Sequence, residues 1–221
     1  MVHSAAHGPD AVLQGLSREL TWGDLAEGCL AIRAGVPWVA SNTDATLPTE
    51  RGLLPGNGAL VAALRAATDR EPVVAGKPGA GVWRTAAARV GATRPLVIGD
   101  RLDTDIEGAV SAGIPALMVL TGVHGPGDLL RAPSRQRATY LAPDLSALSR
   151  APEWSLLEAA PELEAAVRGD TLVVTDLPDG LVGTDLAPAV IRTAWTRGVD
   201  RLHTSDPVSR SRLAEAGFVV D

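Results

Sequence analysis

The residues best suited to chemistry are a lysine and an aspartate, each of which follows a short apolar run. Lys77 comes after the run Val73–Ala75, within Gly-Lys-Pro, and it is the single lysine among the 20 basic residues. Asp100 follows the run Leu96–Ile98. A lysine ammonium is a compact point charge, which suits one phosphate oxygen and a neighbouring carboxylate better than the broad fork of arginine. Lys77 is therefore a candidate for neutralising an anion, and the alternative is an ordinary surface lysine.

Further acids follow Asp100 in the sequence Gly-Asp-Arg-Leu-Asp-Thr-Asp, which places Asp103 and Asp105 within about one turn of it. Carboxylate oxygens at the end of a strand are ligands that Mg²⁺ accepts. The alternative is structural, because Asp103 or Thr104 could cap the helix that follows and acids are favoured in a first helical turn. Both interpretations can hold, with Asp100 as the ligand and the other acids as cap and brace.

The elements around these residues predict a parallel sheet. Apolar runs at 73–75, 96–98 and 116–120 alternate with helical segments at 81–90 and 105–112. Strands that alternate with helices indicate crossover connections in a parallel sheet. Ligands of such sheets bind beyond the carboxyl ends of the strands. Lys77 and Asp100 are therefore expected to face one crevice.

Upstream of this unit, a strand over 36–41 is expected to lead into a polar loop that contains Asn42 and Asp44. The side chains of this loop could contact a ligand, or they could form an Asx turn. Thr21 is expected to start a helix that ends at Gly35, and the sequence Pro-Gly-Asn-Gly at 55–58 favours a plain turn into a helix over 59–67.

Downstream, the patterns predict a loop over 124–137 and a small edge element over 140–148. They also predict a helical stretch over 154–167 that is interrupted near Pro161, a strand at 172–174, and helices over 188–197 and 209–216. This last part indicates a small α/β extension with no obvious site.

Composition excludes several classes of protein. The net charge of −6 argues against a general nucleic-acid binder. No apolar run reaches 18 residues, so no membrane span is expected. The N-terminus lacks the basic start and apolar core of a signal peptide, and Cys29, the one cysteine, excludes an internal disulfide. These features predict a cytoplasmic protein.

Several ordered motifs resemble the haloacid dehalogenase superfamily of phosphatases. Gly-Lys-Pro at 76–78, then Leu-Val-Ile-Gly-Asp-Arg-Leu-Asp-Thr-Asp-Ile and Ala-Gly-Ile, are similar to the third and fourth motifs of its NagD-like, nitrophenylphosphatase-like branch. Residues 39–46 and 54–60 resemble the α/β cap of that branch, and the resemblance covers roughly residues 9 to 145. It implies an α/β cap over 1–73 and the second half of a Rossmann-like core with a parallel sheet over 74–148. The α/β extension over 149–221 faintly resembles the acetyltransferase-related extension of actinobacterial glycerol-phosphate phosphatases.

The resemblance also implies an activity, which is Mg²⁺-dependent hydrolysis of small phosphate esters, glycerol phosphate among them. In this interpretation Lys77 neutralises the phosphoryl oxygens and braces the nucleophile, and Asp100 binds Mg²⁺ with support from Asp105. Asn42 and Asp44 contact the small phosphorylated substrate from the cap.

The nucleophile of that family is missing from the sequence. The family attacks phosphorus with the first aspartate of Asp-x-Asp-Gly, and here Asp103-Thr-Asp105 lacks the following glycine. The first hypothesis is therefore a phosphatase that is inactive as this chain, because of a misplaced start or a truncated gene. The second is a non-catalytic remnant that binds ligands or partners. The absent first strand would leave the strand at 96–98 unpaired on one flank, which predicts homo-oligomers or poor solubility.

Overall fold

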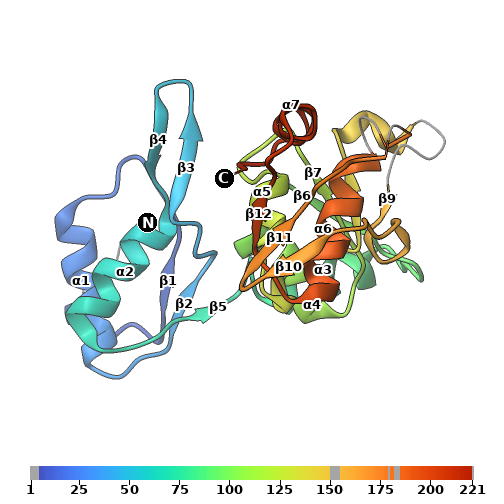
Figure 1. Ribbon diagram of the computed structural model, residues 1–221. Coiled ribbons are helices and arrows are strands. Elements are labelled where there is room, and N and C mark those ends of the chain that lie inside the picture. Colours follow the sequence, from blue (N-terminus) through green and yellow to red (C-terminus); the bar gives the residue numbers. More distant parts are fainter. Residues whose placement is uncertain (1–4, 150–154, 179, 182–184, 221) are drawn as a thin grey trace. The chain divides into compact units, whose positions relative to one another are not determined.

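The computed structural model describes residues 5–149, 155–178, 180–181 and 185–220 (Figure 1). The chain divides into two compact units, Met1–Gly91 and Ala92–Asp221. Both units combine helices with sheets that contain parallel strands, which confirms the predicted α/β class. In the described part of the chain, no helix has the length and apolar character needed to cross a membrane.

The N-terminal unit contains a three-stranded parallel sheet in the order β1-β2-β5. The strands are β1 (Val12–Gln14), β2 (Trp38–Ala40) and β5 (Val73–Val74), and helices α1 (Trp22–Arg33) and α2 (Asn57–Thr68) belong to the same unit. Apolar side chains of α1, β2 and α2 form its core, and the buried indole Nε1 of Trp38 donates a hydrogen bond to Gln14 Oε1 at 2.9 Å. Helix α3 (Ala80–Arg89) follows β5.

The prediction that the Lys77 run and the Asp100 run lie in one sheet is wrong. Val73 and Val74 pair with Val39 and Ala40 of β2, whereas the strand before Asp100 belongs to another sheet. Val73 is 68% exposed, as befits a two-residue edge strand rather than a central one. Which sheet a short apolar run joins depends on long-range hydrogen bonds, and local sequence does not encode these.

Helix α1 begins where the sequence predicts, because Thr21 and Asp24 form a capping box. The Asp24 N–H donates to Thr21 Oγ1 at 3.3 Å, and the Thr21 N–H donates to Asp24 Oδ2 at 2.7 Å. These hydrogen bonds from the Thr21 backbone and side chain lower the pKa of the Asp24 carboxyl below its usual value of 3.8.

Replacing Asp24 by alanine is expected to lower the melting temperature near neutral pH but not in acid. A carboxyl whose folded pKa is depressed stabilises the fold above its unfolded pKa, and this contribution disappears as the pH falls through the folded pKa. The melting temperatures of Asp24→Ala and wild type should therefore differ at about pH 6 and converge near about pH 2. Glu19→Ala is the control, because the Glu19 side chain lies outside the capping box. A difference that persists unchanged in acid would contradict the prediction.

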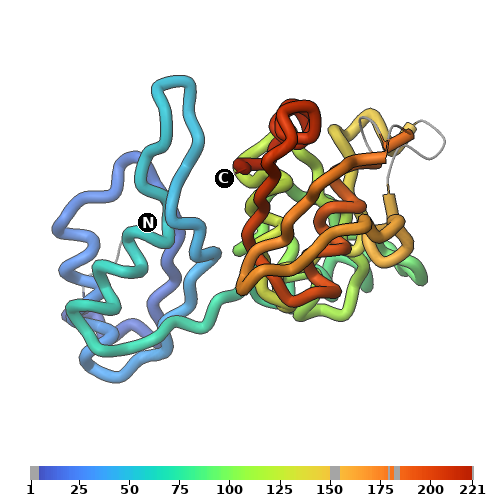
Figure 2. Tube along the Cα trace, viewed as in Figure 1, coloured from blue at the N-terminus to red at the C-terminus, as the bar shows by residue number. Residues whose placement is uncertain are grey.

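A hairpin in the N-terminal unit was not predicted. Strands β3 (Thr46–Thr49) and β4 (Gly52–Pro55) pair antiparallel and project away from α1 and α2 (Figure 2). Thr49 Oγ1 donates to the Gly52 carbonyl at 2.8 Å and closes the tip, while Gly52 adopts a φ of 110° that a side chain would disfavour. The sequence does not predict this hairpin, because it contains Pro48 and Pro55. Proline is rare inside strands and is tolerated mainly in the edge strands of a sheet.

The second unit contains a four-stranded sheet in the order β6-β7-β8-β9. Strands β6 (Val97–Gly99), β7 (Ala116–Val119) and β8 (Tyr140–Ala142) are parallel, and β9 (Ser155–Leu156) is antiparallel to β8. All four residues of β7 are buried, which makes it the centre of this core. The element predicted at 140–148 lies inside the sheet rather than at its edge, whereas β6 is an edge strand within this sheet.

Helices of the second unit differ from the prediction in two places. A π-helical turn (Leu102–Ile106) precedes α4 (Glu107–Ala112), where one helix was expected from 105 to 112. Helix α5 (Pro126–Leu130) occupies part of the predicted loop over 124–137. Proline at the first position of α5 and the Asp128 carboxylate, which accepts the Gly125 N–H at 2.9 Å, favour a helix start there.

The C-terminal part contains a second sheet in the order β10-β11-β12, with strands β10 (Ala166–Arg168), β11 (Thr171–Val173) and β12 (Arg201–His203). Helices α6 (Leu186–Arg197) and α7 (Pro207–Glu215) confirm the two predicted helices, and β11 confirms the predicted strand. The helical stretch expected over 154–167 is wrong in the described part, where short strands and a 3₁₀ turn (Leu157–Ala159) stand instead, and Trp154 lies outside the described residues. Pro161 interrupts the spacing on which that helix was predicted.

Side chains of α6 fasten this extension to the rest of the second unit. The indole Nε1 of Trp195 donates to the carbonyls of Leu129 at 3.1 Å and Leu130 at 3.2 Å, at the end of α5. The Arg137 guanidinium lies over the Trp195 ring, 4.7 Å from its centroid. The extension and the four-stranded sheet are thus parts of one packed unit.

Candidate functional site

Asp100 lies at the carboxyl end of β6, and the loop after β7 holds it in place. The Val123 N–H donates to Asp100 Oδ2 at 2.8 Å, and the His124 N–H donates to the Asp100 carbonyl at 3.1 Å. Within the described residues, Asp100 Oδ1 accepts no hydrogen bond. One oxygen of this carboxylate is thus fixed by the backbone and the other is open to a ligand.

Glycine at position 122 is what allows this approach. A Cβ atom at Gly122 would lie 1.9 Å from Asp100 Oδ2 and 2.3 Å from its Cγ, which is far inside contact distance. Gly122 follows Thr121 just beyond the buried strand β7, so the two adjacent strand ends meet through a glycine backbone. Any side chain at 122 would push the carboxylate away from the Val123 N–H.

The other two acids of the predicted cluster each accept hydrogen bonds from Arg101. Asp103 accepts two hydrogen bonds from the Arg101 guanidinium, from Nε at 3.2 Å and from an Nη at 2.9 Å. Asp105 is only 5% exposed, and its Oδ2 accepts the Arg101 N–H at 3.3 Å. No group of three or more His, Cys, Asp or Glu side chains that could hold a metal occurs in the described ranges.

The π-helical turn explains why these acids do not converge. The N–H groups of Asp105 and Ile106 both donate to the Arg101 carbonyl, at 3.1 and 3.0 Å, which widens the first turn by one residue. The Asp105 carboxylate therefore accepts the N–H at the start of its own turn. The sequence had suggested Asp103 or Thr104 for this capping role. The expectation that Asp103 or Thr104 caps this helix is wrong.

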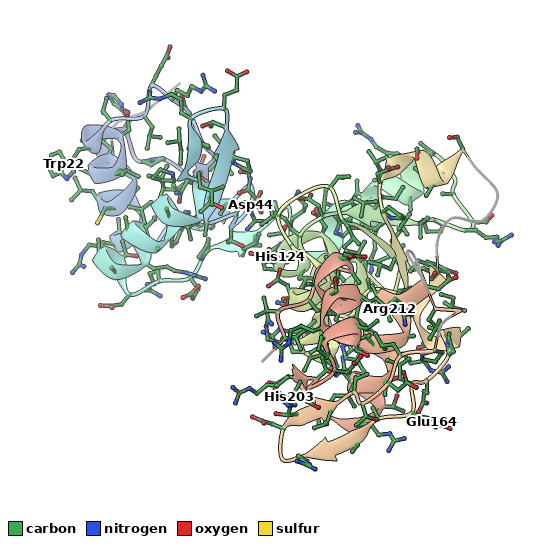
Figure 3. The ribbon with its side chains drawn as sticks, turned by 45° about the horizontal axis from the view of Figure 1, so that its top comes forward. Trp22, Asp44, His124, Glu164, His203 and Arg212 are labelled. Carbon is green, nitrogen blue, oxygen red and sulfur yellow. The ribbon has the colours of Figure 1, made fainter. Side chains whose placement is uncertain are left out.

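His124 is a residue of this region that sequence analysis missed (labelled in Figure 3). Its Nδ1 accepts the Leu102 N–H at 3.1 Å, at the start of the π-helical turn. Helix starts leave N–H groups without partners inside the helix, and a side chain from a distant loop can accept them. A single histidine 24 residues after Asp100 carries no sequence signal, because only the pairing of β6 with β7 brings them together.

In the N-terminal unit, Asn42 and Asp44 form the Asx turn that was one of the two alternatives (Asp44 is labelled in Figure 3). The Asp44 N–H donates to Asn42 Oδ1 at 3.2 Å. Asn57, at the start of α2, donates from Nδ2 to the Asn42 carbonyl at 2.7 Å. Asp44 Oδ1 is buried and has no hydrogen-bond partner among the described residues. The hydrogen bonds of Asn42 thus hold the conformation of the loop, whereas Asp44 Oδ1 could still accept a hydrogen bond from a ligand.

The same unit brings this loop to Lys77. The Thr43 N–H donates to the Lys77 carbonyl at 3.4 Å, and the Lys77 side chain is half-buried. A Cβ atom at Gly76 would lie 1.9 Å from the Ser41 carbonyl oxygen, so glycine permits the close approach of the two segments. Lys77 and the Asn42–Asp44 loop are therefore neighbours, although β5 is not a strand of the second sheet. That Lys77 and Asp100 face one crevice stays a prediction.

The turn before α2 also serves this loop. The Gly56 N–H donates to the Ala45 carbonyl at 2.9 Å, and the Gly58 N–H donates to the Asp44 carbonyl at 2.8 Å. These backbone hydrogen bonds agree with the interpretation of Pro-Gly-Asn-Gly as a plain turn.

A separate cavity of about 290 Å³ lies between β1 and α1, and none of the predicted site residues lines it.

Residues 74–148 match the family model described as HAD-hydrolase-like. Over 140 residues, which are 63% of this chain and 40% of the relative, the chain is 60% identical to D-glycerol 3-phosphate phosphatase of Mycobacterium tuberculosis. It is 42% identical over 116 residues to 5'-nucleotidase YutF of Bacillus subtilis, covering 52% of this chain and 45% of that protein. The chain thus spans less than half the length of these two relatives.

Solved structures give the same picture. A glycerol phosphate phosphatase from Mycobacterium tuberculosis in complex with magnesium superposes with a TM-score of 0.85 at 45% identity, over 99% of this chain and 66% of that one. A 4-nitrophenylphosphatase from Thermotoga maritima superposes with a TM-score of 0.59 at 34% identity, over 65% of this chain and 55% of that one. The resemblance to haloacid dehalogenase-type phosphatases is thereby confirmed.

Proposed function

Because this chain is a relative of the haloacid dehalogenase-like hydrolases, we propose that it forms part of a Mg²⁺-dependent phosphatase that acts on a small phosphate ester. The observation that carries the proposal is the Asp100 carboxylate, with one oxygen fixed by the Val123 N–H at 2.8 Å and the other open. It lies within the matched residues 74–148. Glycerol phosphate is the proposed substrate, because the similar sequence and the similar solved structure from Mycobacterium tuberculosis are both named as glycerol phosphate phosphatases.

The residues of this chain fit a magnesium site in part. Mg²⁺ is commonly held by one or two carboxylates, with waters and substrate phosphate completing its shell. Asp100 Oδ1 supplies one such oxygen, while Asp103 is occupied by Arg101. Asp105 is proposed to support Asp100 by fixing the Arg101 backbone. When bound, the ion would neutralise charge on the phosphoryl oxygens.

The proposed roles in the N-terminal unit concern the substrate. The Lys77 ammonium would neutralise a phosphoryl oxygen as a point charge. Asp44 Oδ1 would accept a hydrogen bond from a hydroxyl group of the substrate. Asn42 would hold the conformation of the loop that carries Asp44. A cap over 1–73, a core region over 74–148 and an extension over 149–221 remain our proposed division. A cytoplasmic location and self-association through β6 remain predictions.

Turnover by the mechanism that the resemblance implies needs the nucleophile motif Asp-x-Asp-Gly, which occurs nowhere in these 221 residues. The absence favours, as a second candidate, a chain that binds phosphate esters without hydrolysing them. The deciding experiment joins this chain to an N-terminal segment that contains Asp-x-Asp-Gly, the motif that the family resemblance implies. We expect the fusion to hydrolyse glycerol phosphate with Mg²⁺. A folded fusion that binds the ester but never releases phosphate would favour the second candidate.

Magnesium is expected to bind the 221-residue chain only weakly. One open carboxylate does not offset the dehydration of Mg²⁺, so the dissociation constant should be roughly millimolar or higher. Calorimetric titration of the wild-type chain measures it, with Asp100→Ala as the comparison. Micromolar binding that Asp100→Ala abolishes would mean that the site assembles without a first-motif aspartate, contrary to this account.

A further inference from the structure

The His124 imidazole is held at one point by the start of the π-helical turn. Its Nδ1 accepts the Leu102 N–H at 3.1 Å, and its own backbone N–H donates to the Asp100 carbonyl at 3.1 Å. The ring is half-buried, so part of it reaches solvent. The segment after β6 therefore fixes both the backbone of His124, through Asp100, and one side of its ring, through Leu102.

These contacts determine the tautomer. A ring nitrogen that accepts an N–H must present a lone pair, so the neutral imidazole carries its proton on Nε2. Within the described residues, His124 Nε2 makes no hydrogen bond. The fold thus orients a neutral N–H donor whose partner is not supplied by the described parts of the chain.

The position of the Nε2–H donor indicates which kind of ligand it could bind. His124 follows Val123, whose N–H fixes Asp100 Oδ2, so both lie at the carboxyl edge of β6 and β7. Ligands of parallel sheets bind at this edge. A phosphate group bound there would lie near the Asp100 carboxylate. Because both groups are negatively charged, hydrogen-bond donors are needed to offset their repulsion. The Arg101 guanidinium, which is close in sequence, is already hydrogen-bonded to Asp103.

We propose that His124 is a phosphate-binding residue, whose Nε2–H donates a hydrogen bond to a non-bridging oxygen of the substrate's phosphoryl group. The inference rests on the proposed phosphatase function and adds to it a residue that is absent from the set predicted by sequence. It requires no proton transfer, because His124 acts only as a neutral hydrogen-bond donor.

Two substitutions separate this role from the structural one. His124→Asn retains an acceptor near the position of Nδ1, so it can still accept the Leu102 N–H, but it has nothing at the position of Nε2. His124→Gln places an amide near the position of Nε2 and cannot accept the Leu102 N–H in the same way. We expect His124→Asn to retain stability and lose phosphate affinity by about tenfold or more. His124→Gln should lose stability and retain more of the affinity.

The test is histidine ¹⁵N nuclear magnetic resonance on the 221-residue chain at one fixed pH. The first expected result is an Nε2–H tautomer for His124. The second is a shift of the His124 signals when inorganic phosphate is added with Mg²⁺, with His203 of β12 as the internal control. An Nδ1–H tautomer would overturn the inference.

The outcomes also separate this inference from the proposed function. Phosphate that shifts the backbone signals of Asp100 and Val123 but not those of His124 overturns the inference alone. Phosphate that shifts no signal in the chain overturns the inference too, and the turnover of the fusion protein then decides the proposed function by itself.

Discussion

The 221-residue chain is expected to hydrolyse p-nitrophenyl phosphate at no more than the background rate, about 10⁵-fold or more below the fusion that carries Asp-x-Asp-Gly. Lys77 and a bound ion can stabilise negative charge, but neither of them can form the covalent aspartyl phosphate. The purified chain would be assayed with Mg²⁺ across a range of pH.

The controls for this assay are variants of the fusion protein. Asp100→Asn removes the proposed ligand charge and should reduce kcat by about 10²-fold or more. Glu19→Ala, which changes an exposed acid in the N-terminal unit, should leave it unchanged. Robust turnover by the unfused chain that disappears with Asp100→Asn would show that it contains an unrecognised nucleophile.

Replacing Gly122 by alanine is expected to destabilise the second unit by about 1–3 kcal/mol. The new Cβ would lie 1.9 Å from Asp100 Oδ2, so either the loop or the carboxylate must move. Displacement would break the hydrogen bond from the Val123 N–H. The free energy of unfolding, measured by urea denaturation, reports the stability, and the kcat of the fusion protein reports the site.

Gly125→Ala is the matched control, three residues along the same loop. A Cβ atom at Gly125 meets nothing within 4 Å, and its φ of −107° suits any residue. We expect this variant to unfold like wild type. Equal stability and equal kcat for the two variants would mean that the loop accommodates a methyl group and that Gly122 does not determine the position of Asp100.

The elements that could be predicted from sequence are those whose cause is local. Strand β7 is an apolar run followed by a turn, and α1 begins at a threonine whose capping partner lies three residues later. Asp100 was located because a short strand ends in Gly-Asp. In each case the pattern and the structure depend on residues close together in the chain.

The elements that could not be predicted depend on distant partners. Val73–Val74 joins β2 because of hydrogen bonds across more than thirty positions, and an apolar dipeptide is compatible with either sheet. The π-helical turn redirects Asp103 and Asp105 by adding one residue to a turn, which no composition reveals. His124 approaches Asp100 only through the pairing of β6 with β7. The sequence therefore predicted the position of Asp100 at a strand end and gave no sign of the loop residue beside it.

The Trp195 contact has a consequence for how the protein unfolds. The indole joins α6 to the end of α5, and Arg137 covers its ring, so the extension cannot detach without exposing these groups. Residues 92–221 should therefore melt in a single cooperative transition and should resist proteolytic separation into two stable fragments. Three signals would then be lost along one common unfolding curve: the burial of tryptophan, the amide protection of β7 and the resistance to protease. The extension would thus be a structural part of the core and not an appended domain.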